Sequence, residues 1–190
     1  MLRTIGVLIV MASVAAGCAP HAALDNADGA VESRYKTAPD PPQGYARVYI
    51  LPIGLTTFWG GHSELAGDIF LGSDKSDQVF VGGVSPGRFL AFDLPEGSYY
   101  LSAVPWAVAS TPSAETFLLH AGTVLFLRPR SYGTSGAEGL LGFLILPARQ
   151  PDDPQFEGLD AAAGISDIQP MRMAAISPAA TRAEGVKQHD

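Results

Sequence analysis

The stretch FLAFDLPEGSYYLSAV, residues 89–104, decides the predicted fold. Two apolar-patterned arms flank Leu94-Pro95-Glu96-Gly97, in which proline pre-sets the φ of the second position of a type I turn and glycine suits the fourth. Alternate residues fall on one face of each arm: Leu90, Phe92 and Leu94, then Tyr99, Leu101 and Ala103, with Ser98 and Ser102 opposite. Because period-two alternation marks a half-buried strand, the stretch predicts a β-hairpin with one face in the core.

Short apolar segments on both sides of this stretch predict further strands: Tyr45–Leu51, Gly67–Gly72, Gln78–Gly82, Glu115–His120, Thr123–Arg128 and Leu140–Leu146. Residues 124–127 are apolar on both faces, so their strand is expected to be central or covered on its outer side. About seven short strands around one core predict an all-β domain, namely a single antiparallel β-sandwich. A small open β-barrel is the alternative.

Composition limits the chain to one domain and disfavours nucleic acid as a partner. With 190 residues, 47% of them hydrophobic, the chain can fill one core, and its 21 glycines and 15 prolines favour many turns over long helices. The net charge is -7, and no cluster of lysine or arginine stands out. Since phosphate binding needs a basic footprint, no nucleic-acid partner is expected.

The first 17 residues have the pattern of a secretion signal. Arg3 and the amino terminus supply positive charge, residues 5–16 form an uncharged apolar run, and Cys18 follows small residues. The run is shorter than the roughly 20 residues that span a bilayer as a helix. Cys18 is the only cysteine, so it cannot form an intramolecular disulfide.

Ala15-Ala16-Gly17-Cys18 resembles the lipobox of bacterial lipoproteins, in which a peptidase cuts before a cysteine that carries diacylglycerol. The resemblance implies that residues 1–17 are removed and that Cys18 anchors the chain in a membrane of the cell envelope, since acyl chains contribute about 0.8 kcal/mol per buried methylene. Ala19 carries no inner-membrane retention signal, which favours the outer membrane, facing the periplasm. Ordinary signal cleavage nearby is the alternative.

The segments that flank the domain are polar or rich in alanine and proline. Residues 18–43 lack apolar periodicity and predict a flexible tether, although a short helix over 22–31 is an alternative. The domain is expected to span residues 44–176, and residues 177–190 are expected to form a disordered tail.

The domain also resembles an uncharacterised family of bacterial lipoprotein domains whose sandwich is similar to prealbumin-like and carboxypeptidase-regulatory modules. The matching pieces lie between Ala46 and Ser166: ARVYILPI, FDLPEGSYYLSA, ETFLLHAGTVLFLRP and LLGFLILPA. The resemblance implies the fold and a lipid-anchored setting. It implies no activity, because the family has none assigned.

Motifs that could carry catalysis are poorly supported by their context. The run from Gly83 to Gly87 matches G-x-S-x-G, but Pro86 lacks the backbone NH that an oxyanion hole needs after the serine, and a strand follows where the motif needs a helix. The histidines at positions 21, 62, 120 and 189 form no pair at ligand spacing. Neither a metal nor a cofactor is predicted, and His120 is expected to be solvated at a strand end.

Asp93 and Glu96 beside the turn could form an acid pair for glycoside cleavage. Carboxylates that flank a turn more often cap it or solubilise it, so the non-catalytic interpretation is preferred. The alternative function is an envelope hydrolase whose carboxylate site no motif in the sequence reveals.

One loop could recognise a partner. Phe58, Trp59 and His62, with Trp106, supply aromatic side chains that could stack on a glycan or anchor another envelope protein. The competing interpretation is that these aromatics close the open end of the sandwich. The sequence therefore predicts a lipid-anchored envelope protein with a non-catalytic binding or scaffolding domain.

Overall fold

The computed structural model describes residues 26–37, 40–56, 62–106, 110–131, 154–183 and 186. Its strands are β1 Tyr45–Ile50, β2 Ile53–Thr56, β3 His62–Leu65, β4 Gly67–Gly72, β5 Gln78–Val84, β6 Arg88–Pro95, β7 Gly97–Pro105, β8 Ser113–Leu119, β9 Val124–Ser131, β10 Phe156–Leu159 and β11 Arg172–Met173. Its helices are α1 Gly29–Thr37, α2 Ala161–Ile168 and α3 Pro178–Ala183. The predicted strand over 140–146 lies outside the described residues.

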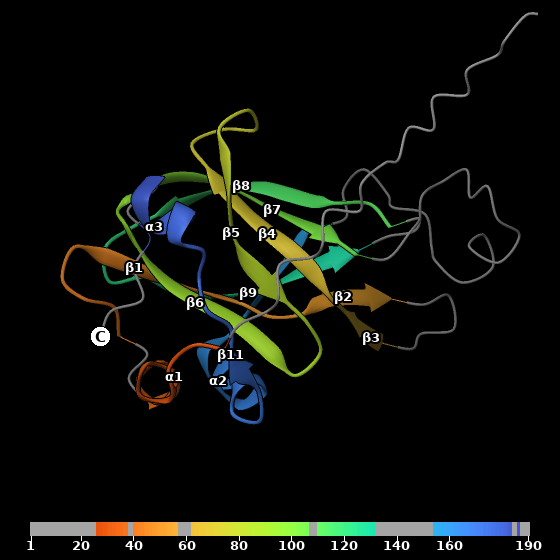
Figure 1. Cartoon of the computed structure of the whole chain (residues 1–190), viewed down its shortest axis with the longest axis horizontal. Helices are drawn as coiled ribbons and strands as arrows, with labels where there is room; N and C mark the ends of the chain where they lie inside the picture. The colour runs from red at the N-terminus through yellow and green to blue at the C-terminus, as the bar shows by residue number, and fades with distance from the viewer. Residues whose placement is uncertain are drawn as a thin grey trace, which may run out of the picture.

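The described strands form two sheets (Figure 1). The larger sheet has seven strands in the order β11-β6-β1-β9-β2-β3, with β10 also paired to β9, and the smaller sheet has the order β5-β4-β7-β8. The all-β prediction is confirmed. The expectation of purely antiparallel sheets is wrong, because β1 and β2 run parallel to β9, and β11 runs parallel to β6.

The stretch predicted as a hairpin is instead a crossover between the two sheets. β6 pairs with β1, whereas β7 pairs with β4 and β8. The chain turns at Glu96, where the hydroxyl of Tyr99 donates a 2.9 Å hydrogen bond to the carbonyl of Pro95. The alternation within each arm is correct, but the two apolar faces oppose each other across the core and do not lie side by side.

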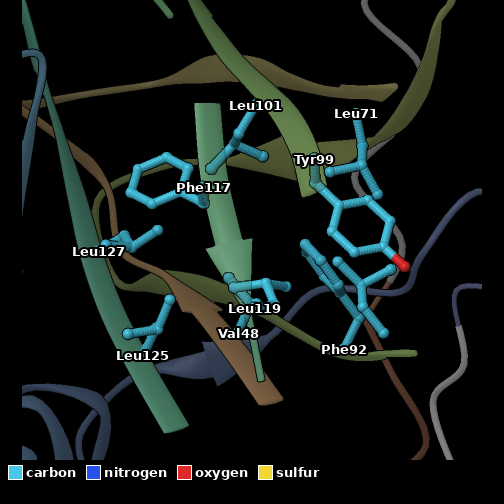
Figure 2. A pocket seen from close by; sticks show the side chains of 10 residues that line it. Val48, Leu71, Phe92, Tyr99, Leu101, Phe117, Leu119, Leu125 and Leu127 are labelled. Carbon is cyan, nitrogen blue, oxygen red and sulfur yellow. The ribbon is translucent and has the colours of Figure 1, made fainter. Parts of the chain in front are cut away.

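The main core fills the space between the sheets (Figure 2). Val48 and Phe92 of the larger sheet point toward Leu71, Leu101 and Leu119 of the smaller one. Leu101, which the alternation places inside, is 2% exposed. Its neighbour Ser102, expected to face outward, is 7% exposed, and its hydroxyl donates to the side-chain oxygen of Gln78.

A second core covers the opposite face of the larger sheet, where α1 and α2 pack (Figure 1). The ring of Tyr49 stacks on that of Phe126 with 4.3 Å between centroids, and Tyr35 of α1 and Ile168 of α2 cover them. β1 and β6 are therefore buried on both faces. The expectation that residues 124–127 form a central or covered strand is confirmed, since β9 has neighbours on both edges and α2 on one face.

Part of the expected tether is packed on the domain. Residues 29–37 form α1, and the backbone NH of Ala27 donates to the carbonyl of Met173 at 2.9 Å. Tyr35 of α1 is 1% exposed. The helix packs because its tyrosine ring and Val31 contact the apolar outer face of the sheet, a partner that sequence periodicity does not reveal. The helix lies later in the chain than the alternative over 22–31.

The beginning of the expected tail is packed in the same way. Residues 178–183 form α3 beside β5, and the backbone NH of Ser177 donates to the carbonyl of Val81 at 2.6 Å. Ala180 and Val186 are fully buried. The described part of this segment therefore belongs to the domain.

Glu32 holds α1 to β11 through two donors of β11 and accepts a third hydrogen bond from its own helix. It accepts from Lys36 Nζ at 2.9 Å, from Arg172 Nε at 2.9 Å and from the backbone NH of Met173 at 3.1 Å. Burial alone would raise the pKa of this carboxyl, but the hydrogen bonds and the charge of Lys36 outweigh burial and lower the pKa below its ordinary value. The ionised form is therefore the one that stabilises the fold.

We predict that Leu101→Ala destabilises the domain by about 2 to 5 kcal/mol, because a buried leucine leaves a cavity when it is truncated. A domain of this size has only about 5 to 15 kcal/mol to lose. Urea unfolding measures the effect. Ser98→Ala, at an exposed position of the same strand, is the control, and equal midpoints for the two variants would contradict the assignment of Leu101 to the core.

We predict that Glu32→Gln destabilises the fold at pH 7 and has little effect at pH 3. Because the folded pKa of Glu32 lies below the unfolded value, the stability it contributes is present above the unfolded pKa and is lost as pH falls through the folded pKa. Urea midpoints of both proteins across this range test the effect. A difference between the two proteins that is independent of pH would show that the glutamate charge does not hold α1.

Candidate functional site

The described structure contains only part of the sequence-predicted recognition loop. Cys18, Phe58 and Trp59 lie outside the described residues. His62 begins β3, and the backbone NH of Trp106 donates to the carbonyl of Ala66 at 3.0 Å, one residue past the end of β3. The backbone of Trp106 therefore lies beside the end of β3, the strand that His62 begins, whereas the aromatic cluster itself stays a prediction.

Asp93 and Glu96 do not form an acid pair in a cleft. Asp93 is fully buried, where its Oδ1 accepts from Arg47 Nε at 2.7 Å and its Oδ2 from Arg47 Nη2 and the Tyr35 hydroxyl, each at 3.0 Å. Glu96 is exposed and accepts from the backbone NH of Ala121 at 3.1 Å. The expectation of a solvated or capping carboxylate is right for Glu96 and wrong for Asp93, because the packing of α1 covers this end of β6.

Burial and neighbouring charges shift the pKa values of Arg47 and Tyr49, which lie close to Asp93. Burial would lower the pKa of Arg47, but the hydrogen bonds and charge of Asp93 outweigh it and raise that pKa above its ordinary value. Burial raises the pKa of Tyr49 to about 12, although the charge of Arg47 opposes the shift. The hydroxyl of Tyr49 donates to the carbonyl of Tyr35 at 2.7 Å. These groups form a sealed structural network that no substrate reaches.

Ser85 occupies a tight turn and not a nucleophile elbow. The backbone NH of Arg88 donates to the carbonyl of Ser85 at 2.8 Å, Gly87 adopts a φ of 76°, and β6 follows directly. His120 is exposed beside Glu96, with 3.9 Å from its Nδ1 to Oε1, as expected for a solvated histidine. Within the described residues, no group of three or more His, Cys, Asp or Glu side chains could hold a metal ion.

The cavity between the sheets is too small for a ligand (Figure 2). Its volume is about 10 Å³, and its walls are apolar side chains of both sheets. One water molecule needs about 10 to 15 Å³. The cavity is a packing defect of the core.

A polar groove of about 500 Å³ opens on the larger sheet where β2, β3, β9 and β10 meet. The residues that line it are Gly54, Leu55, Ser63, Glu64, Arg128, Arg130 and Glu157. The groove differs from the interior cavity in size and in its charged walls. Among the described residues it is the surface best suited to hold a ligand.

The sheet register and one glycine create the hollow. Gly54 of β2 pairs with Glu64 of β3 on one side and with Arg130 of β9 on the other. A Cβ atom on Gly54 would lie 3.2 Å from Cδ of Arg128, so the arginine stem occupies space that a larger residue would take. Arg128 and Arg130 are two residues apart in a strand and so project from the same face.

The charges in the groove are mostly paired. Arg128 Nη2 lies 2.6 Å from Asp167 Oδ2 of α2, and Arg130 Nη2 lies 3.2 Å from Glu157 Oε2. Nε of Arg128 is buried and has no hydrogen-bond partner among the described residues. Glu64 is exposed, and no described residue donates a hydrogen bond to it or forms an ion pair with it. Glu64 is thus the unbalanced charge of the groove.

This arrangement can recognise a ligand, but its described residues contain no nucleophile held by a general base.

The sequence analysis did not predict the groove, although one signal was present. LRPRS at residues 127–131 places two arginines on one face of a strand directly after an apolar run. The partners of these arginines come from residues 157 and 167, which no spacing rule connects to the strand.

In the described part of the chain, no helix is long and apolar enough to cross a membrane. Comparisons with protein-family models, with curated proteins and with solved structures find no match to this chain.

Proposed function

We propose that this chain is a lipid-anchored protein of the bacterial cell envelope whose β-sandwich domain binds a partner through the polar groove and does not catalyse. The groove carries the proposal, because it combines a volume of about 500 Å³ with charged and hydroxyl groups on rigid strands. Binding sites typically combine a hollow with a few polar groups that orient the ligand. The partner class that we expect is another envelope protein or a glycan.

The proposed anchor is Cys18, in the lipobox-like run from Ala15 to Cys18. Because the described part of the chain begins at Asn26, which bridges to Ala174, only the seven residues 19–25 separate the proposed lipid from the domain. Fully extended, the eight steps from Cys18 to Asn26 span at most about 29 Å. Such a tether would keep the domain near the membrane surface. Ala19 favours the outer membrane, with the domain facing the periplasm.

The burial of Asp93 removes one candidate carboxylate from the alternative function. An envelope hydrolase, the alternative, would need accessible carboxylates on both sides of a substrate bond. Asp93 is fully buried and bonded to Arg47 and Tyr35, so it cannot serve as one of them in this structure.

We predict that Cys18→Ser leaves an unprocessed precursor and abolishes labelling by a fatty-acid probe in cells. The thiol is the acceptor of the diacylglycerol, and serine cannot replace it. Metabolic labelling followed by gel analysis of precursor size measures both effects. Equal labelling of the variant and the parent would overturn the lipid anchor.

We predict that Glu64→Trp weakens crosslinking of envelope partners to the full chain in cells, because the indole would enter the groove from an exposed position on the sheet face that carries Arg130. Glu115→Trp makes the same change at an exposed position of the smaller sheet and should leave crosslinking unchanged. If Glu64→Trp and its control crosslink equally, the groove is not the recognition site. Phe58→Ala with Trp59→Ala tests the sequence-predicted loop in the same assay.

A further inference from the structure

Strand alternation decides which side chains face the groove. Gly54 of β2 lies between Glu64 of β3 and Arg130 of β9 in the sheet register. Arg128 lies two residues before Arg130 in β9, and Glu157 of β10 is its register partner. Because directly paired residues and residues two apart project from the same face, the four charged side chains share the face that Gly54 leaves bare.

The groove is therefore walled by charged groups, and the stem of one arginine forms its floor. A Cβ atom on Gly54 would lie 3.2 Å from Cδ of Arg128, so this stem covers the bare position. Leu55 and Ser63 also border the groove, but their side chains alternate to the opposite face of the sheet. A ligand in the groove is thus recognised by hydrogen-bonding groups and gains little from apolar contact.

Ions of either sign fit this groove poorly. Nη2 of Arg128 lies 2.6 Å from Asp167 Oδ2. Nη2 of Arg130 lies 3.2 Å from Glu157 Oε2, so an anion would have to compete with carboxylates for both guanidinium groups. A cation would find one exposed carboxylate outside these pairs, that of Glu64, and an exposed ion pair contributes little free energy. A neutral ligand leaves both pairs intact.

The pair of Arg130 and Glu157 can bind a neutral ligand without separating. A guanidinium group has five N–H donors, and a carboxylate has about four acceptor sites. The contact between Nη2 and Oε2 uses one of each. The two side chains are 35% and 37% exposed, so a ligand in the groove can reach them. A donor group and an acceptor group therefore face the ligand side by side.

Two neighbouring hydroxyls match this pair. A hydroxyl both donates and accepts hydrogen bonds, so one of two hydroxyls on adjacent carbons can accept from the guanidinium while the other donates to the carboxylate. A peptide group cannot bridge the pair in this way, because the N–H and C=O of a trans peptide point in opposite directions. Saccharides present neighbouring hydroxyls on each sugar ring.

We propose that the groove binds a neutral saccharide, in which one of two neighbouring hydroxyls accepts from Arg130 and the other donates to Glu157. A hydroxyl of the next sugar unit donates to Glu64, which lies two strand spacings from Arg130, about 9 to 10 Å across Gly54. The saccharide is either a free oligosaccharide or a section of an envelope polysaccharide. This inference rests on the proposed function, since it names the ligand chemistry of the same groove.

The test uses the full chain, isotopically labelled and purified in micelles of a sugar-free detergent, with cellobiose, lactose, mannobiose and N,N′-diacetylchitobiose as probes. At least one probe should shift the backbone amide resonances of Gly54, Glu64 and Arg130 in a saturable manner. Glu157→Ala should raise the dissociation constant of that probe about tenfold, the scale of one hydrogen bond to a charged group. Affinity should be equal at about 50 and about 500 mM salt, because a neutral ligand has no charge to be screened.

Glu115→Ala is the matched control, because Glu115 is an exposed strand glutamate of the smaller sheet, and it should leave the affinity unchanged. Tighter binding of the hexasaccharide than of the disaccharide of the same sugar would identify a polysaccharide as the source, and equal binding would identify a free oligosaccharide. Either result supports the inference.

The absence of a saturable shift with all of the neutral probes would overturn the inference. Equal affinity of the parent and Glu157→Ala would also overturn it, as would tighter binding of glucuronate or glucosamine than of any neutral probe. The proposed function would survive these results if Glu64→Trp still weakened crosslinking. Equal crosslinking of Glu64→Trp and its control would instead overturn the proposed function.

Discussion

The fold depends on the buried ion pair between Arg47 of β1 and Asp93 of β6. Two hydrogen bonds of 2.7 and 3.0 Å join the side chains, and the Tyr35 hydroxyl of α1 satisfies the carboxylate further. The guanidinium carbon lies 4.1 Å from the centre of the Tyr35 ring. Removing one partner of such a pair leaves a buried charge, which costs about 3 to 5 kcal/mol. The pair therefore links three elements and requires α1 to stay on the sheet.

The covered sheet in turn supports the groove. Phe126, Arg128 and Arg130 project from the same face of β9, two residues apart. Phe126 is buried under α2, and Arg128 binds Asp167 of α2. Arg130 faces the groove beside Glu157. One strand thus passes from an apolar core to a polar surface at the edge of the helix. Because β9 has neighbours on both edges, the groove rests on a rigid base.

The packing of α1 also bears on how the domain would present the groove. The described chain enters at Asn26, next to β11, whereas β2 and β3 lie at the opposite end of the larger sheet (Figure 1). If a lipid on Cys18 holds the chain, the entry end is the one near the bilayer. The groove would then face away from the anchor, where a partner in the envelope can approach it.

The sequence by itself determined the strands and core residues whose alternation is clear, because period-two alternation reports local burial, but it did not indicate β2, β3 or β10. Most described strands were predicted, as was the burial of Leu101. Only the tertiary structure decided which strands pair: alternation is the same in a hairpin and in a crossover, so β6 and β7 could not be assigned to different sheets. The same holds for α1, which is stabilised by contacts with distant residues, and for the groove, whose charges come from three separate strands and α2. Pairing and charge balance depend on long-range contacts that no local pattern encodes.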